Sequence, residues 1–253
     1  MRRTALCCQN RLVAAGTDTF RSLESRQATA VSGSFFHLPT LEYPHGDGIA
    51  PVISRKQLSF TRDVYHTSAV SDLNALTIGS PEEGHTLDAV IQGTAFDAKR
   101  SMVHSAASEH FNHSFAMRSL RPFGVPVPPQ LRNLLHNQFV GAGGNGSLDK
   151  NLNDLFVFEA LSNEHKSGWL YLVWKGTEME IRHFAHGTCP LTGPQIPLLC
   201  VNIHEHAYCL DYPTTEDGLE RYVRNCVKAF NWNVAARYYD LAIGVKNLDL
   251  LGS

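Results

Sequence analysis

The sequence predicts an α+β protein in which an N-terminal helical hairpin is followed by a small three-stranded sheet flanked by helices. Two long segments with helical spacing of apolar residues occupy the first half of the chain, and three short β-rich runs separated by turn residues follow in the second half. With 253 residues, of which 43% are hydrophobic, the chain is long enough to bury a core as one large domain or two small ones.

The predicted hairpin begins at a capping-box spacing that starts with Ser54. An apolar stripe at helical spacing then continues until Gly79, through Leu58, Tyr65, Ala69, Leu73 and Leu76. We expect a second helix over residues 99–120, because residues 121–129 contain four prolines and end it. These two helices predict the hairpin.

The second half begins with a short helix and a glycine-rich loop at 141–147. A longer helix leads into the three predicted strands, and two further helices follow them. The expected helices cover 131–139, 148–161, 216–230 and 234–245, and the strands cover 168–174, 178–184 and 196–203. We therefore divide the chain into a leader at 1–30, a helical hairpin domain at 31–140 and an α/β domain at 141–253.

The leader differs in charge from the rest of the chain. Residues 1–30 hold five arginines and two acidic residues, a net charge of +3, and the remainder carries 17 basic and 22 acidic side chains. An arginine-rich, acid-poor start with Ser, Thr and Ala is typical of a mitochondrial transit peptide, although a basic tail of a cytosolic protein has the same composition. No apolar run is long enough to cross a bilayer, so we expect no membrane partner. The acidic remainder argues against extensive contact with RNA.

Thirteen histidines make a metal site the first chemistry to consider. His110 and His113 lie three residues apart on a predicted helix, and His204 and His206 flank Glu205 just after a predicted strand. Such groups can hold a transition metal, but ordinary hydrogen-bonded core histidines give the same pattern.

Several segments resemble the signature blocks of the iron/manganese superoxide dismutases. They are FHLPTLEYPHGDGIAPVIS (36–54), FNHSF (111–115), SGWLYLV (167–173), PLLCVNIHEHAYCLDY (197–212) and NWNVAARY (231–238). The blocks occur in order over about residues 35–243, and their combination is specific although each is short. The resemblance implies the dismutase fold, with a three-stranded antiparallel sheet.

The resemblance also implies four metal-ligand positions, which the family fills with three His and one Asp. In this chain they are Thr61, His113, Asn202 and His206, so two of the four ligands are replaced. A hydroxyl and a neutral amide are poor substitutes for an imidazole and a carboxylate. We therefore expect no bound iron or manganese, no cofactor and no catalytic residues.

Other family positions have changed as well. Ala69 stands where the family has its gateway Tyr, His204 stands where it has a Trp, and Glu109 or His165 falls where members place a metal-proximal Gln. One alternative stays open: His204 or His66 could join His113 and His206 in a rebuilt site, for which zinc is the favoured metal.

The resemblance points to a surface for pairing between subunits. Glu205, His206 and Tyr208 match family positions at the dimer interface, and His66 matches one of two paired histidines on the first helix. Glu205 as a locally paired buried acid is an equal alternative. We expect an interface at His66, Glu205, His206 and Tyr208 with a second dismutase-like chain, more readily than with an identical copy.

A dismutase fold with a broken metal site behind a mitochondrial leader resembles the dismutase-like proteins of the small subunit of the mitochondrial ribosome. The resemblance implies a non-catalytic docking protein in the mitochondrial matrix, with small-subunit ribosomal proteins as partners and limited contact with ribosomal RNA. The alternatives are a mitochondrial iron/manganese superoxide dismutase and a free, inactive partner of one.

Overall fold

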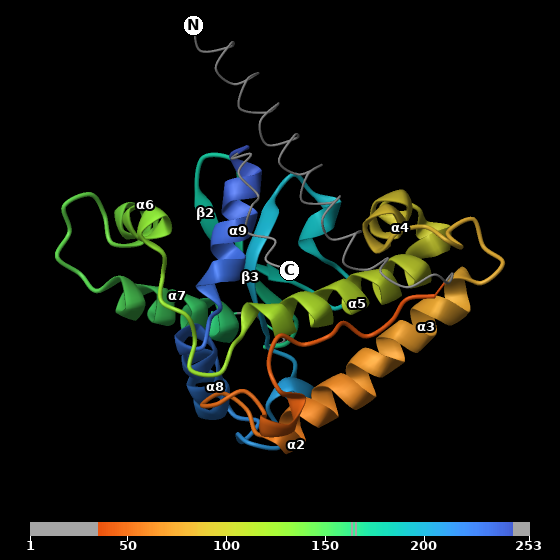
Figure 1. Ribbon diagram of the computed structural model, residues 1–253, viewed down its shortest axis with the longest axis horizontal. Coiled ribbons are helices and arrows are strands. Elements are labelled where there is room, and N and C mark those ends of the chain that lie inside the picture. Colours follow the sequence, from red (N-terminus) through yellow and green to blue (C-terminus); the bar gives the residue numbers. More distant parts are fainter. Residues whose placement is uncertain (1–34, 163, 165, 245–253) are drawn as a thin grey trace, which may run out of the picture.

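The computed structural model describes residues 35–162, 164 and 166–244, so the predicted leader lies outside the described residues. Its first half is the predicted helical hairpin (Figure 1). Ser54 caps α2 (Arg55–Ser59) by accepting a hydrogen bond from the backbone N–H of Gln57. The chain continues through the π-helical segment η2 (Phe60–His66) into α3 (Thr67–Thr77), and α5 (Ser101–Ser119) forms the second arm.

The N-terminal half differs from the prediction in two places. The single helix predicted from Ser54 to Gly79 contains the wider π-helical turns of η2, which apolar periodicity does not reveal. A further helix, α4 (Leu87–Thr94), packs on α5 and was not predicted. It has only 8 residues, and the apolar stripe that identifies a longer helix spans barely two turns here.

The second half contains the predicted sheet, with α6 (Pro129–Phe139) and α7 (Leu148–Ser162) before it. The strands β1 (Trp169–Trp174), β2 (Met179–Phe184) and β3 (Ile196–Asn202) are antiparallel in the order β2-β1-β3. The α+β prediction and the antiparallel sheet are therefore confirmed.

Helices cover the sheet and connect it to the hairpin. Strand β1 is buried along its whole length, and α5 and α9 (Trp232–Ala242) both pack against β3, while α7 packs against α8 (Glu216–Lys228) (Figure 1). Helix α5 also packs against α3, so it lies between the hairpin partner and the sheet. Side chains of α5 therefore meet both halves of the molecule.

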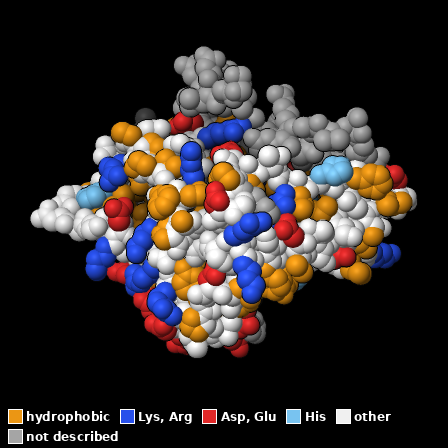
Figure 2. All heavy atoms as spheres, turned by 60° about the horizontal axis from the view of Figure 1, so that its bottom comes forward, with side chains coloured by type: hydrophobic (Ala, Val, Ile, Leu, Met, Phe, Trp, Pro, Cys, Tyr) orange, Lys and Arg blue, Asp and Glu red, His pale blue; other side chains and the backbone are white. Residues whose placement is uncertain are grey.

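Two further features concern the surface and the helices. Figure 2 shows a face on which basic, acidic and hydrophobic side chains are intermingled, without the continuous basic stripe that nucleic-acid binding uses. Among the described helices, none combines the length and the apolar character needed to cross a membrane.

Candidate metal centre

A cavity of about 510 Å³ opens where the hairpin meets the sheet domain. Its walls come from η2, α3 and α5, and they include Tyr65 and Ala69. Glu109, His113, His186 and His206 line it as well. The cavity therefore brings together titratable side chains from both halves of the chain.

The four family ligand positions lie close together, but hydrogen bonds occupy three of them, Thr61, Asn202 and His206. The Thr61 hydroxyl lies 3.1 Å from the Gln57 carbonyl oxygen and 3.2 Å from the His206 carbonyl oxygen, and it also accepts a bond from the Gln57 amide at 3.1 Å. The Asn202 amide nitrogen lies 3.4 Å from His206 Nε2. Because Nε2 can accept that N–H, its lone pair is directed at an amide rather than at a metal.

The residues present therefore do not fit the family's metal. A space of only about 30 Å³ remains beside Thr61, His113 and Asn202, and its other lining residues are mostly apolar. Of the four positions, His113 alone combines deep burial with an imidazole that no described residue bonds at Nδ1. One free imidazole cannot replace three imidazoles and a carboxylate.

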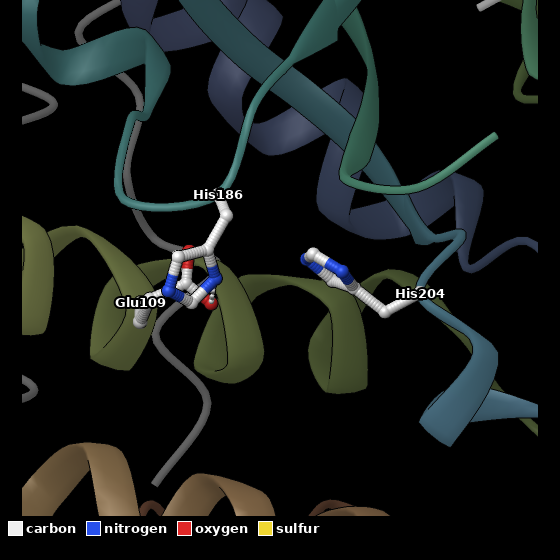
Figure 3. Close-up of side chains that lie close together, drawn as sticks. All are labelled: Glu109, His186 and His204. Carbon is white, nitrogen blue, oxygen red and sulfur yellow. Dashed lines mark ion pairs between the residues drawn. The ribbon is translucent and has the colours of Figure 1, made fainter. Parts of the chain in front are cut away.

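A second group of possible ligands lies beside this position: Glu109, His186 and His204, each with a ligand atom within 4.8 Å of the others (Figure 3). Glu109 comes from α5, His186 from the loop after β2, and His204 from the residues just after β3. In Figure 3 the ring of His186 hangs over the Glu109 carboxylate, and His204 approaches from the opposite side. We call these three residues the EHH cluster.

The carboxylate of the EHH cluster is held in place by two donors. Glu109 Oε1 accepts hydrogen bonds from Trp169 Nε1 at 3.1 Å and from the Gly187 backbone N–H at 2.8 Å. Glu109 Oε2 lies 3.4 Å from His186 Nδ1. Burial raises the pKa of Glu109, but the bonds from His186 and Gly187 outweigh it and lower the pKa to about 2. The group is therefore an anion at neutral pH.

The two histidines of the cluster differ in environment. Burial lowers the pKa of His204 to about 4, so its imidazole is neutral at neutral pH. His204 Nδ1 lies 2.7 Å from Ser167 Oγ, and its Nε2 is buried without a hydrogen-bond partner among the described residues. His186 is largely exposed, and its hydrogen bond to Glu109 raises its pKa.

The rebuilt zinc site considered from the sequence used His113, His204 and His206. The structure does stack the rings of His204 and His206, with centroids 5.0 Å apart, and places the His113 ring 5.7 Å from that of His206. Burial lowers the pKa of His206 to about 3, yet its Nε2 faces Asn202. His204 is thus shared with the EHH cluster, and His165 lies outside the described residues.

Sequence reasoning did not single out His186, although a signal was present. Phe184 ends β2 and Asn202 ends β3, and both pair with Trp169 at the start of β1. The two histidines that lie two residues beyond the ends of β2 and β3 therefore meet at the same end of the sheet. A central β1 with antiparallel neighbours would have predicted this meeting.

The predicted interface residues fall into two groups. Glu205 is exposed and His206 is partly exposed, so the alternative of a buried, locally paired Glu205 is wrong. His66 and Tyr208 are buried inside this chain: His66 Nε2 lies 2.9 Å from His110 Nδ1, and the Tyr208 ring stacks on that of Tyr222. These two side chains cannot form a surface without rearrangement, and pairing through Glu205 and His206 stays a prediction.

Two family models match the chain. Residues 35–121 match the alpha-hairpin domain of the iron/manganese superoxide dismutases, and residues 144–238 match the C-terminal domain of the same family. Together the two matches cover more than half of the chain.

Curated relatives agree with these matches. An iron superoxide dismutase of Synechococcus elongatus is 30% identical over 213 residues, covering 82% of this chain and 98% of its own. An iron superoxide dismutase of Coxiella burnetii is 28% identical, covering 81% of this chain and 98% of its own. A chloroplastic iron superoxide dismutase of Arabidopsis thaliana is 28% identical, covering 85% of this chain and 79% of its own.

These relatives overturn the prediction of a non-catalytic component of the mitochondrial ribosome, because they are named as enzymes and none of them as a ribosomal protein. The reasoning from Thr61 and Asn202 treated the loss of two ligand positions as the loss of the whole site, and it overlooked the EHH cluster. On the family matches and the identity to these relatives, the chain belongs to the iron/manganese superoxide dismutase family.

Proposed function

We propose that this chain is a metal-dependent superoxide dismutase. The observation that carries the proposal is an anionic carboxylate and two imidazoles gathered beside a cavity of about 510 Å³, in a chain whose relatives are named iron superoxide dismutases. A carboxylate with two imidazoles is a ligand set for iron in catalytic proteins.

Dismutation converts two superoxide anions and two protons into dioxygen and hydrogen peroxide, so a bound redox metal would supply the electron exchange and the protein must supply the protons. The cavity admits water and a small anion to the side chains that line it. Burial lowers the pKa of His206 to about 3, so this imidazole carries no spare proton at neutral pH. Because His186 belongs to the EHH cluster, we look for the proton donor among the hydroxyl groups and water of the cavity.

Tyr65 is the phenol that the cavity offers, beside the hydroxyls of Ser68 and Ser105. Its ring stacks on His206 with centroids 3.9 Å apart, and its side chain lines the cavity together with Ala69, four residues further along the helix. The family's gateway Tyr is replaced at Ala69, and Tyr65 brings a phenol to the same wall from the preceding helical turn. We assign Tyr65 the role of proton donor and orienting group.

The proposal is tested on the purified full chain loaded separately with Fe²⁺, Mn²⁺ or Zn²⁺ and freed of unbound metal. Superoxide decay followed by stopped-flow absorbance should accelerate in proportion to protein-bound iron or manganese, and zinc should give no acceleration because it has no redox chemistry. A chain that holds stoichiometric iron or manganese and leaves superoxide decay at the rate of buffer would contradict the proposal.

Tyr65→Phe is expected to lower kcat about 10-fold or more and to leave metal content unchanged, because a positioned proton donor typically contributes on the order of 100-fold or more to a proton-transfer step. The phenyl ring keeps the stacking contact with His206. Phe60→Leu is a suitable control, because it alters the aromatic neighbour of Tyr65 without removing a hydroxyl. Equal loss of kcat in both variants would assign Tyr65 a packing role instead.

We place the protein in an organelle. The Arabidopsis relative is named chloroplastic, and residues 1–30 of this chain carry the net charge of +3 that favours mitochondrial import. We also propose that Glu205 and His206 contact a second dismutase-like chain, because Glu205 is exposed and its neighbour His206 is partly exposed at the cavity. Fusing residues 1–30 to a fluorescent reporter tests the location, and a cytosolic reporter would refute it.

A further inference from the structure

We infer that this chain binds a divalent first-row transition metal at Glu109, His186 and His204, displaced from the four positions that its family uses. The role of the metal in catalysis rests on the proposed function. Its position rests on the geometry of the three side chains. The family positions lack two ligands, and the EHH cluster supplies a carboxylate and two imidazoles beside them (Figure 3).

Glu109 is already arranged as a ligand. Its Oε1 is fixed by Trp169 Nε1 and the Gly187 N–H, at 3.1 and 2.8 Å, and these bonds orient the carboxylate. Its Oε2 faces His186 Nδ1 at 3.4 Å and accepts no other described hydrogen bond that would compete with a cation. Carboxylate ligands of metals are usually oriented by such outer hydrogen bonds.

His204 has a ring nitrogen without a hydrogen-bond partner among the described residues. The side chain is 8% exposed, and its Nε2 is buried with no hydrogen-bond partner among the described residues. Leaving a buried polar atom unpaired costs roughly 1–3 kcal/mol, and a metal ion bound at Nε2 would remove this cost. The contact between His204 Nδ1 and Ser167 Oγ at 2.7 Å fixes the orientation of the ring and leaves Nε2 as the ring nitrogen without a partner among the described residues.

The three ligand atoms are close to the spacing that a single metal ion requires. Atoms bound to one metal at about 2.1 Å lie roughly 3 to 3.5 Å apart, and the cluster atoms lie within 4.8 Å of one another. Glu109 is held by two buried donors and His204 by the partly buried Ser167, whereas the His186 side chain is 70% exposed on the loop after β2. His186 is therefore the ligand that can move most readily toward the other two.

The ligand set selects the class of metal. Two imidazoles with one carboxylate and open positions bind iron(II) in non-haem enzymes and zinc in hydrolytic ones, whereas calcium and magnesium prefer oxygen ligands. The cluster lies beside the cavity of about 510 Å³, so a metal there would keep open positions for a small ligand. We therefore expect binding of Fe²⁺, Co²⁺ and Zn²⁺ and no selective binding of Mg²⁺.

The test measures metal binding rather than activity. Full-length protein is stripped with a chelator and titrated with Co²⁺, whose visible absorption reports nitrogen and oxygen ligation, and bound Fe²⁺ and Zn²⁺ are quantified after dialysis. We expect one equivalent in the unchanged chain and at least about 100-fold weaker binding in Glu109→Gln and His204→Gln, since losing even an outer partner of a metal ligand costs about 10- to 100-fold.

Two matched controls separate the EHH cluster from other sites. His85→Gln removes an exposed imidazole that is not part of the cluster, and Thr61→Val removes the hydroxyl at a family ligand position. Both should bind metal within about 2-fold of the unchanged chain. Glu109→Gln is nearly isosteric, so circular dichroism and thermal unfolding should show a folded protein, and this variant alone is sufficient if His204→Gln misfolds.

The outcomes separate the displaced metal site from the proposed function. Binding that survives Glu109→Gln and His204→Gln, and is lost in His113→Gln and His206→Gln, overturns the displaced site and returns the metal to the family positions. Absence of binding in the unchanged chain overturns it as well. Binding at the cluster without accelerated superoxide decay leaves the site standing and refutes the proposed function.

Discussion

Metal-free protein is expected to unfold steeply when the pH falls below about 6.5. Four histidines of the core, His66, His110, His113 and His204, are each at most 8% exposed. Burial lowers the pKa of all four, well below its ordinary value for His66, to about 3 for His110 and to about 4 for His113 and His204. Each imidazole is therefore neutral in the folded chain.

The sign of the change in stability with pH follows from proton binding. Between pH 6.5 and about 4, the unfolded chain protonates these side chains and the folded chain does not, so the free energy of unfolding falls as the pH falls. Each such histidine contributes about 1.4 kcal/mol per pH unit, and four together contribute on the order of 5 kcal/mol per pH unit. Because a domain is stable by only about 5–15 kcal/mol, unfolding within one to two pH units is expected.

Urea unfolding of chelator-treated protein at a series of pH values measures this slope. Replacing His66, whose Nε2 lies 2.9 Å from His110 Nδ1, by Phe should reduce the slope by about one proton, or about 1.4 kcal/mol per pH unit. His85→Gln removes an exposed histidine and should leave the slope unchanged. A slope below one proton over the whole interval would show that the core histidines are protonated in the folded chain.

Most of the fold could be predicted because local patterns and tertiary structure agree. The apolar run of β1 is buried on both faces, and the capping spacing at Ser54 starts a helix in the structure. Helix α4 was missed because it is short, and η2 was missed because a π-helical turn leaves no mark in apolar spacing. Packing between segments distant in the sequence determines these two features.

The candidate site was harder to predict because it depends on strand register. Motif blocks located His113 and His206, and both line the cavity. Glu109 contacts His186, which lies 77 positions further along the chain, and it also accepts a hydrogen bond from the backbone N–H of Gly187. No single segment of the sequence contains this information. Reading only the four family positions led from two lost ligands to a lost activity, whereas the fold places replacement ligands beside them.

Restoring the family ligands is expected to return the metal to the family position. In a Glu109→Gln background, Thr61→His and Asn202→Asp together give three imidazoles and a carboxylate with His113 and His206, and they remove the amide that lies 3.4 Å from His206 Nε2. Two regained ligands should strengthen binding of Fe²⁺ and Mn²⁺ by at least about 100-fold over Glu109→Gln alone, measured by metal content after dialysis. The two single restorations on the same background serve as controls, and each should recover much less because one ligand is still missing. If the combined variant gains no metal while remaining folded, then Thr61 and Asn202 are not the reason that the family position fails, and the apolar lining of the space of about 30 Å³ beside them is the remaining physical cause.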